Sequence, residues 1–220
     1  YGYNPPYKAI KYASFILEGA DKADAPESVI NLAKSQAHFI RALSYFFLTR
    51  LYGYVPLVTS TNPSADIQMT APEQIYEFVL EELDKAEQYL PESKWNTPDL
   101  PSEVVSEMPS VWKDNGGMAT DVWVKTVRAN VYITMAGWPL KKGQEYYKLA
   151  AEEAKLIIDN ADKYGIKLME DYQDLWLMEH NFNPEGIITF GYNILGLHNQ
   201  IAPNSARPAS EPVLGDYKSW

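Results

Sequence analysis

The fold is decided by residues 28–60, which read SVINLAKSQAHFIRALSYFFLTRLYGYVPLVTS. Apolar residues recur there at three- to four-residue steps or their multiples, the period of a helix with one buried face. These residues are Val29, Ala33, Ala37, Ile40, Phe47 and Leu51. Gly53 can end such a helix, and Pro56 prevents its return and favours extended backbone before it. The stretch predicts one long amphipathic helix that leads into a short extended segment at 55–59.

A helix is predicted on each side of this stretch. Residues 7–20 place their apolar side chains on one helical face and follow the pair Pro5 and Pro6, which suits a helix start. Further on, Thr70 and Glu73 have the spacing of a capping box, in which the hydroxyl and the carboxylate each bond a backbone N–H. The apolar residues after them recur at helical spacing as far as Pro91. We therefore expect a capped helix to begin near Thr70.

Residues 92–119 show no sustained periodicity and contain several prolines. Loops longer than about 12–15 residues are uncommon unless they are functional or disordered. Trp95 and Trp112 lie in this stretch, and a merely disordered linker would usually lack such residues. We predict an irregular insertion here.

Two more helices are predicted between residues 120 and 160, at 120–136 and 144–160. Helices joined by so short a turn pack antiparallel, and the alanines of the second allow a close approach. A short helix at 172–178 and a strand at 185–193 follow, the strand because side chains alternate there. The helix pairs are similar to tetratricopeptide (TPR) hairpins of about 34 residues, although the TPR sequence signature is absent.

Residues 41–58, RALSYFFLTRLYGYVPLV, resemble the helix and exit turn of the SusD/RagB family. That family has an alanine-rich turn followed by LRA, aromatic pairs and LYGDVPLV. The chain departs from the pattern at Tyr54, where an aspartate is usual, and at Gln36, where a glutamate is common. Any role of those two acids is therefore not carried over to this chain.

Two later blocks resemble the same family in the same order. Lys163, Tyr164 and Gly165 match a KYGL turn that ends the family's helical hairpin. Residues 183–193, NPEGIITFGYN, resemble its SxEIIF strand. The resemblance runs from about residue 28 to 193 and implies a mostly α fold, a TPR-like superhelix of paired antiparallel helices with long loops and a little β structure.

SusD-like proteins are considerably longer than 220 residues. The chain opens at Tyr1 without an initiator methionine, a secretory signal or a lipidation cysteine, and it ends at Trp220 after a proline-rich run. We expect residues 1–220 to be one SusD-like domain and a fragment of a longer chain. What the missing segments contribute, and the oligomeric state, do not follow from these residues.

The chain carries a net charge of −10, from 19 basic and 29 acidic residues, and shows no basic stripe. Nucleic acids and anionic lipid surfaces are therefore poor partners, because both require clustered Lys and Arg. Cysteine is absent, which excludes disulfides, zinc–thiolate clusters and thiol catalysis. No apolar run approaches the roughly 18 residues that span a bilayer, so we expect membrane attachment only through a lipid anchor outside this sequence.

No pattern of catalytic residues stands out, and we predict no enzyme, no cofactor and no metal site. His38, His180 and His198 are isolated in the sequence and match no ligand spacing. Acidic pairs occur, but the carboxylates of a glycoside hydrolase must face each other across the scissile bond. We interpret these acids as solvated helix faces; they are Glu81 with Glu82, Glu152 with Glu153, and Asp171 with Asp174.

Aromatic residues are abundant, with 6 Trp, 16 Tyr and 7 Phe. A flat ring can cover the apolar face of a sugar while nearby polar groups bind its hydroxyls. Aromatics within helices are expected to pack, so loop residues and their polar neighbours are the better candidates for ligand binding. These candidates are Trp95, Trp112, Asn204, Arg207, Tyr217 and Trp220.

The resemblance implies a nutrient-binding lipoprotein on the outer face of the Bacteroidetes outer membrane. Such proteins cap a SusC-like TonB-dependent transporter, bind glycans or sometimes peptides without turnover, and belong to polysaccharide-utilization systems. A TPR-type scaffold that binds protein partners, or a peptide-binding SusD homologue, remains as the alternative function. The sequence does not say which glycan or peptide is bound, because specificity depends on how loop side chains are arranged in space.

Overall fold

The computed structural model describes residues 4–64, 66–92, 105–106, 118–177, 180 and 183–189. All helices and strands below belong to one compact unit, Tyr1–Ile188. Of the second unit, Thr189–Trp220, only Thr189 is described. The expectation of a single domain over 1–220 therefore stays a prediction.

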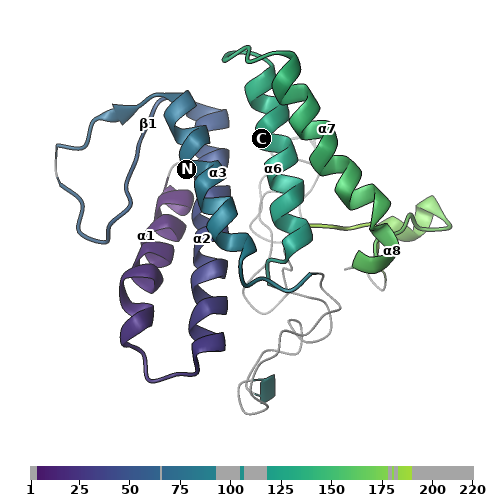
Figure 1. Ribbon diagram of the computed structural model, residues 1–220, viewed down its shortest axis with the longest axis horizontal. Helices are drawn as coiled ribbons and strands as arrows, with labels where there is room; N and C mark the ends of the chain where they lie inside the picture. The colour runs from purple at the N-terminus through teal and green to yellow at the C-terminus, as the bar shows by residue number, and fades with distance from the viewer. Residues whose placement is uncertain are drawn as a thin grey trace, which may run out of the picture. The chain divides into compact units, whose positions relative to one another are not determined.

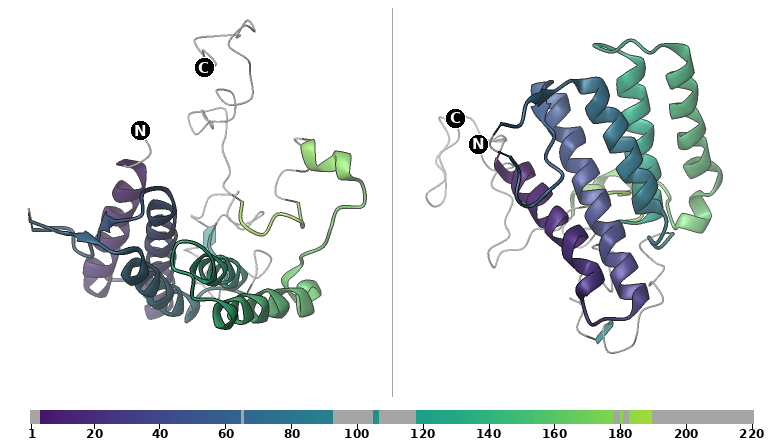
Figure 2. Two further views of the ribbon diagram at one scale, coloured as in Figure 1. Left: turned by 90° about the horizontal axis from the view of Figure 1, so that it is seen from above. Right: turned by 60° about the vertical axis from the view of Figure 1, so that its left-hand side comes forward.

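The described unit is built from helices that lie side by side in chain order (Figure 1). Each of the long helices packs against the next one along the chain. They run alternately up and down, as the turned views also show (Figure 2). The long helices are α1 (Asn4–Gly19), α2 (Glu27–Tyr52), α3 (Pro72–Glu87), α6 (Asp121–Ala136) and α7 (Gln144–Asp159). The predicted mostly α fold of paired antiparallel helices is confirmed.

The quoted stretch forms α2, which supplies the centre of the core. Phe39, Tyr45 and Leu48 are fully buried between α1, α3 and α6. The Tyr45 hydroxyl donates to the carbonyl of Val58 at 2.8 Å and accepts from its N–H at 2.6 Å. This phenol thus ties the extended exit segment to the helix that precedes it.

The end of α2 depends on a glycine. Gly53 has φ 72° and ψ −101°, a region that side-chain-bearing residues rarely occupy. Its N–H closes the helix on the carbonyl of Thr49 at 2.9 Å. The chain then forms strand β1 (Val55–Pro56), which pairs antiparallel with β2 (Met69–Thr70).

The predicted capping box at the start of α3 is wrong. Thr70 pairs with Val55 in the small sheet, so the helix begins after Ala71, with Pro72 in its first turn and no side-chain cap. Glu73 instead forms an ion pair with Lys142, in the loop between α6 and α7. Strand pairing thus prevails over the local capping signal.

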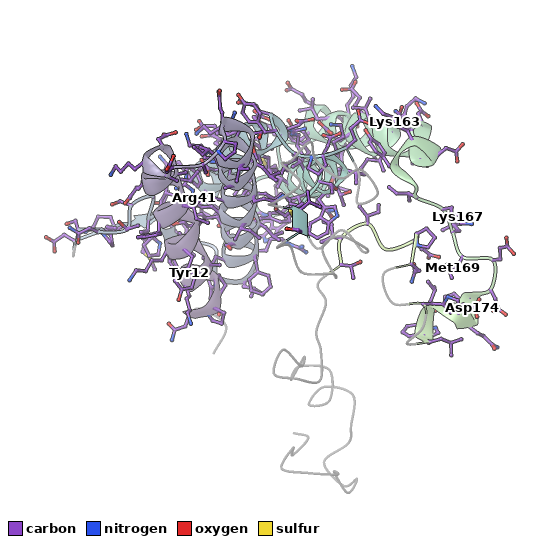
Figure 3. The ribbon with its side chains drawn as sticks, turned by 90° about the horizontal axis from the view of Figure 1, so that it is seen from below. Tyr12, Arg41, Lys163, Lys167, Met169 and Asp174 are labelled. Atoms are coloured by element: carbon purple, nitrogen blue, oxygen red, sulfur yellow. The ribbon has the colours of Figure 1, made fainter. Side chains whose placement is uncertain are left out.

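The α6–α7 hairpin ends in a short helix, α8 (Ala161–Tyr164). Gly165 follows in the left-handed conformation with φ 65°, which a glycine C-cap favours. The chain then leaves the helices through Lys167 and Met169 (Figure 3). It next forms the 3₁₀ helix η2 (Tyr172–Trp176). A second 3₁₀ helix, η1 (Ala20–Lys22), connects α1 to α2.

The predicted strand at 185–193 is described only as far as Thr189, and in that part the backbone forms a turn and bends. The side-chain carbonyl of Asn183 accepts the N–H groups of Glu185 at 3.0 Å and Gly186 at 3.2 Å. Such a side-chain turn competes with extended pairing. Residues 190–193 lie outside the described residues. Among the helices that are described, none combines the length and the apolar character needed to cross a membrane.

Candidate functional site

The six residues predicted to bind ligand lie outside the described residues: Trp95, Trp112, Asn204, Arg207, Tyr217 and Trp220. Their role stays a prediction. The irregular insertion at 92–119 is likewise described only at Glu92, at 105–106 and from 118 onward. Within the described helical unit, two ion-pair clusters and a pocket bring polar side chains together.

The first cluster surrounds Glu82, whose side chain is fully buried in α3. Its carboxylate accepts hydrogen bonds from Arg41 Nε at 2.7 Å and from His38 Nδ1 at 2.8 Å, both from α2. Burial alone would raise the pKa of Glu82, but these hydrogen bonds outweigh it and lower the pKa to about 2. Arg41 also donates to the hydroxyl of Ser14 on α1, so the cluster ties three helices together.

The second cluster centres on Arg128 of α6. Its guanidinium pairs with Asp84 and Glu87 of α3 and with Glu153 of α7. Burial raises the pKa of Glu153 despite the charge of Arg128. At Glu87, hydrogen bonds from Arg128 and Lys125 overcome the effect of burial and hold the pKa at about 2. The cluster joins α3, α6 and α7.

The interpretation of these acids as solvated helix faces is therefore wrong for two of them. Glu82 is buried and Glu153 is mostly buried, because each faces an arginine on a neighbouring helix. Glu81 and Glu152 are exposed as expected. The carboxylates of Glu82 and Glu153 form structural ion pairs with arginines of neighbouring helices. In the described parts of the chain, no three His, Asp or Glu side chains gather as a metal site would require.

A pocket of about 460 Å³ lies where α2 ends, α3 begins and α6 ends. This is within the size range of small-ligand sites, roughly 300–1,000 Å³. Its lining mixes aromatic, apolar and hydrogen-bonding groups; among them are Thr49, Arg50, Tyr76, Ile133, Thr134 and Trp138. The alternating directions of the helices bring these segments, distant in sequence, to one end of the unit.

Trp138 is the most exposed aromatic side chain of the pocket, with 78% of its surface accessible. It follows α6 directly, in the turn that leads to α7. The amine of Lys141 lies over its ring at 4.8 Å from the ring centre. Tyr76, by contrast, is buried, and burial raises the pKa of its phenol while the Arg50 charge opposes the rise.

Arg50 and Thr49 supply polar groups to this pocket. The guanidinium of Arg50 stacks over Phe46 at 5.4 Å from the ring centre, and it forms no ion pair with any described carboxylate. Thr49 is only 3% exposed, and its hydroxyl is buried without a hydrogen-bond partner. An exposed indole and a cation thus meet around one space, as in sites that hold small polar ligands noncovalently.

Sequence reasoning missed this pocket. Thr49 and Arg50 belong to α2, whose side chains were expected to pack, and Trp138 stands between two helix terminators, Gly137 and Pro139. A signal was present nonetheless. Trp138 lies in a turn that is too short to bury it, so its side chain could be expected to be exposed. Trp95 and Trp112 were selected by the same criterion, as aromatic residues outside the helices.

Comparison with known proteins bears on the fold. A family model described as "SusD-like_3: Starch-binding associating with outer membrane" matches residues 1–103. SusD-like protein P2 of Formosa agariphila is 25% identical over 174 residues, which cover 77% of this chain and 29% of that protein. The chain thus spans less than a third of this relative.

Two solved structures share the fold. A SusD superfamily protein of Parabacteroides distasonis aligns with a TM-score of 0.72 and 26% identity, over 89% of this chain and 38% of that one. A structure with a xylogluco-oligosaccharide aligns with a TM-score of 0.69 and 23% identity, over 89% of this chain and 36% of the other.

Proposed function

Because this chain belongs to the SusD/RagB family, we propose that its protein is the glycan-binding component of a SusCD-type uptake system. It captures oligosaccharide at the cell surface and passes it to a TonB-dependent outer-membrane transporter. It binds the sugar noncovalently and does not cleave it. Because the chain spans only 29% and 32% of its curated relatives, this function is assigned to the longer protein.

The observation that carries the proposal is the match to a family described as starch-binding and associating with the outer membrane, over residues 1–103. The structural neighbour with a xylogluco-oligosaccharide supports a glycan as the ligand. The pocket at the ends of α2, α3 and α6 is consistent with this chemistry, since exposed Trp138 offers a flat apolar face beside polar groups.

The proposed absence of turnover is supported by the environment of three described carboxylates, those of Glu82, Glu87 and Glu153. A general acid must hold a proton near neutral pH, which requires a raised pKa. Glu82 and Glu87 have pKa values of about 2 and therefore stay ionised. Glu153 has a raised pKa, but its carboxylate pairs with Arg128 between α6 and α7. These acids hold helices together and are not placed around a substrate.

The proposal also includes the location of the protein and the partner that it binds. The protein sits on the extracellular face of the outer membrane, held by a lipid anchor outside this sequence, and its partner is a SusC-like transporter. The helix pairs dock that transporter, while the ligand is held at loops and helix ends. Coexpression with the transporter and copurification from detergent-solubilised outer membranes would test this arrangement.

Calorimetry of the protein with two panels tests the binding function. One panel contains neutral and acidic oligosaccharides, and the other contains peptides of matched size. We expect saturable heat with at least one oligosaccharide and none with the peptides. Heat from peptides alone would support the TPR-type scaffold or a peptide-binding homologue instead. Release of new reducing ends during incubation would overturn the assignment as a non-catalytic protein.

A further inference from the structure

We infer that the pocket between α2, α3 and α6 selects an acidic sugar unit, one that carries a carboxylate or a sulfate ester. The inference rests on the proposed function and adds the chemical class of the ligand. The evidence for this ligand class is the charge of the side chains that line the pocket. Arg50 is the single charged residue among those that line it, and no carboxylate lines it.

A cation in the lining of this pocket is notable because the chain as a whole has a net charge of −10. An acidic ligand would be repelled by such a chain at long range, so it requires a local cation to bind. The other arginines described in the helices, Arg41 and Arg128, are engaged by buried or half-buried carboxylates. Arg50 has no such partner among the described residues and keeps its donors for a ligand.

The surroundings of Arg50 hold it in place without neutralising it. Its guanidinium stacks over Phe46, a contact that uses the flat face of the group and leaves the N–H donors at its edge. A guanidinium binds a carboxylate or a sulfate through two parallel hydrogen bonds. Arg50 is therefore positioned as an anion receptor at the rim of the pocket.

The remaining groups fit a sugar ring that carries the anion. Trp138 presents an indole for the apolar face of the ring, and Lys141 beside it adds a second cation. A neutral sugar would use the indole but would leave Arg50 without an anionic partner.

The test compares acidic oligosaccharides with neutral counterparts of the same length. Tetragalacturonate is paired with its carboxyl-reduced form, and a sulfated galactan tetrasaccharide with its desulfated form, so the two arms separate carboxylate from sulfate. The variants are Arg50→Gln and, as a matched control, Lys11→Gln, which removes one exposed positive charge from α1. Affinities are measured by calorimetry at low and high salt.

We expect one acidic probe to bind more tightly than its neutral counterpart and to weaken in high salt. Arg50→Gln should reduce that affinity about 10- to 100-fold, reduce the affinity for the neutral counterpart much less and lessen the salt dependence. Lys11→Gln should change none of these. Trp138→Ala should weaken both members of the pair, and thermal unfolding of each variant verifies that it folds.

Three results would overturn the inference. Equal affinity for acidic and neutral members would do so, and so would an acidic probe that Arg50→Gln does not affect. Binding of neutral oligosaccharides alone would also refute the acidic class while leaving the glycan-binding function standing. If no oligosaccharide of either panel binds at all, the proposed function fails with it.

Discussion

Replacing Glu82 by glutamine tests whether its buried ion pairs hold α1, α2 and α3 together. The pKa of Glu82 is about 2 in the folded protein against an ordinary value of 4.5. One pKa unit corresponds to about 1.4 kcal/mol, so the ionised group contributes about 3 kcal/mol to the free energy of unfolding at neutral pH. The substitution also leaves the buried guanidinium of Arg41 without its anion, and breaking such a pair costs about 3–5 kcal/mol.

The pH dependence provides a second, independent expectation. Because the folded pKa lies below the unfolded one, the contribution of Glu82 is fully present above about pH 4.5 and is lost as the pH falls toward 2. The stability gap between the wild type and Glu82→Gln should therefore narrow on acidification. By pH 3 the difference in unfolding free energy between the two proteins should be about half its value at neutral pH.

Urea unfolding followed by far-ultraviolet circular dichroism at pH 7, 5 and 3 measures both effects. The matched control is Glu81→Gln, which alters the exposed neighbour of Glu82 on the same helix. We expect Glu81→Gln to stay within about 0.5 kcal/mol of the wild type. The reasoning is refuted if Glu82→Gln is as stable as this control at pH 7, or if the gap does not change with pH.

Two further substitutions test the exit from α2. Gly53→Ala should lower the free energy of unfolding by about 1–3 kcal/mol, because alanine is strained at φ 72°. The control Gly19→Ala should be neutral, because Gly19 has a negative φ and open space around it. Equal effects of the two substitutions on thermal unfolding would contradict this expectation. Tyr45→Phe should cost about 1–3 kcal/mol by leaving the Val58 N–H without its acceptor, and unchanged thermal stability would show that water replaces the phenol.

The helices could be predicted from the sequence because each is marked by a local period and a local stop. The helical period of α2 and the stop at Gly53 concern residues within a few positions of one another. The buried face predicted for α2 was wrong, however: of its six residues only Ala37 is buried, and Phe47 and Leu51 are exposed, because the neighbouring helices cover another side of α2. Where two local signals competed, the prediction failed. Thr70 has the spacing of a cap but pairs with Val55, which only the folded chain reveals.

The ion pairs and the pocket could not be predicted in the same way, because they join residues far apart in sequence. Glu82 looks like one of two neighbouring surface acids until Arg41 and His38 come to lie against it. The hydrogen bonds of Gln36 also join residues that are far apart in sequence. Gln36 differs from the glutamate common in the family, and its amide both donates to and accepts from the backbone of Ala119, at 2.9 Å in each case. A glutamate could not make both bonds while ionised.

The indole N–H signals of the protein in nuclear magnetic resonance spectra, together with analysis of the recovered sugar, test the central claim most directly. The signals report where a sugar binds, and the recovered sugar shows whether it was cleaved. The chain has six tryptophans, and the Trp138 signal is assigned by its loss in Trp138→Phe. On titration with an oligosaccharide that binds in calorimetry, we predict a saturable shift of the Trp138 signal, with the sugar recovered intact. A shift confined to other tryptophans, or recovery of shortened sugar, would contradict the account.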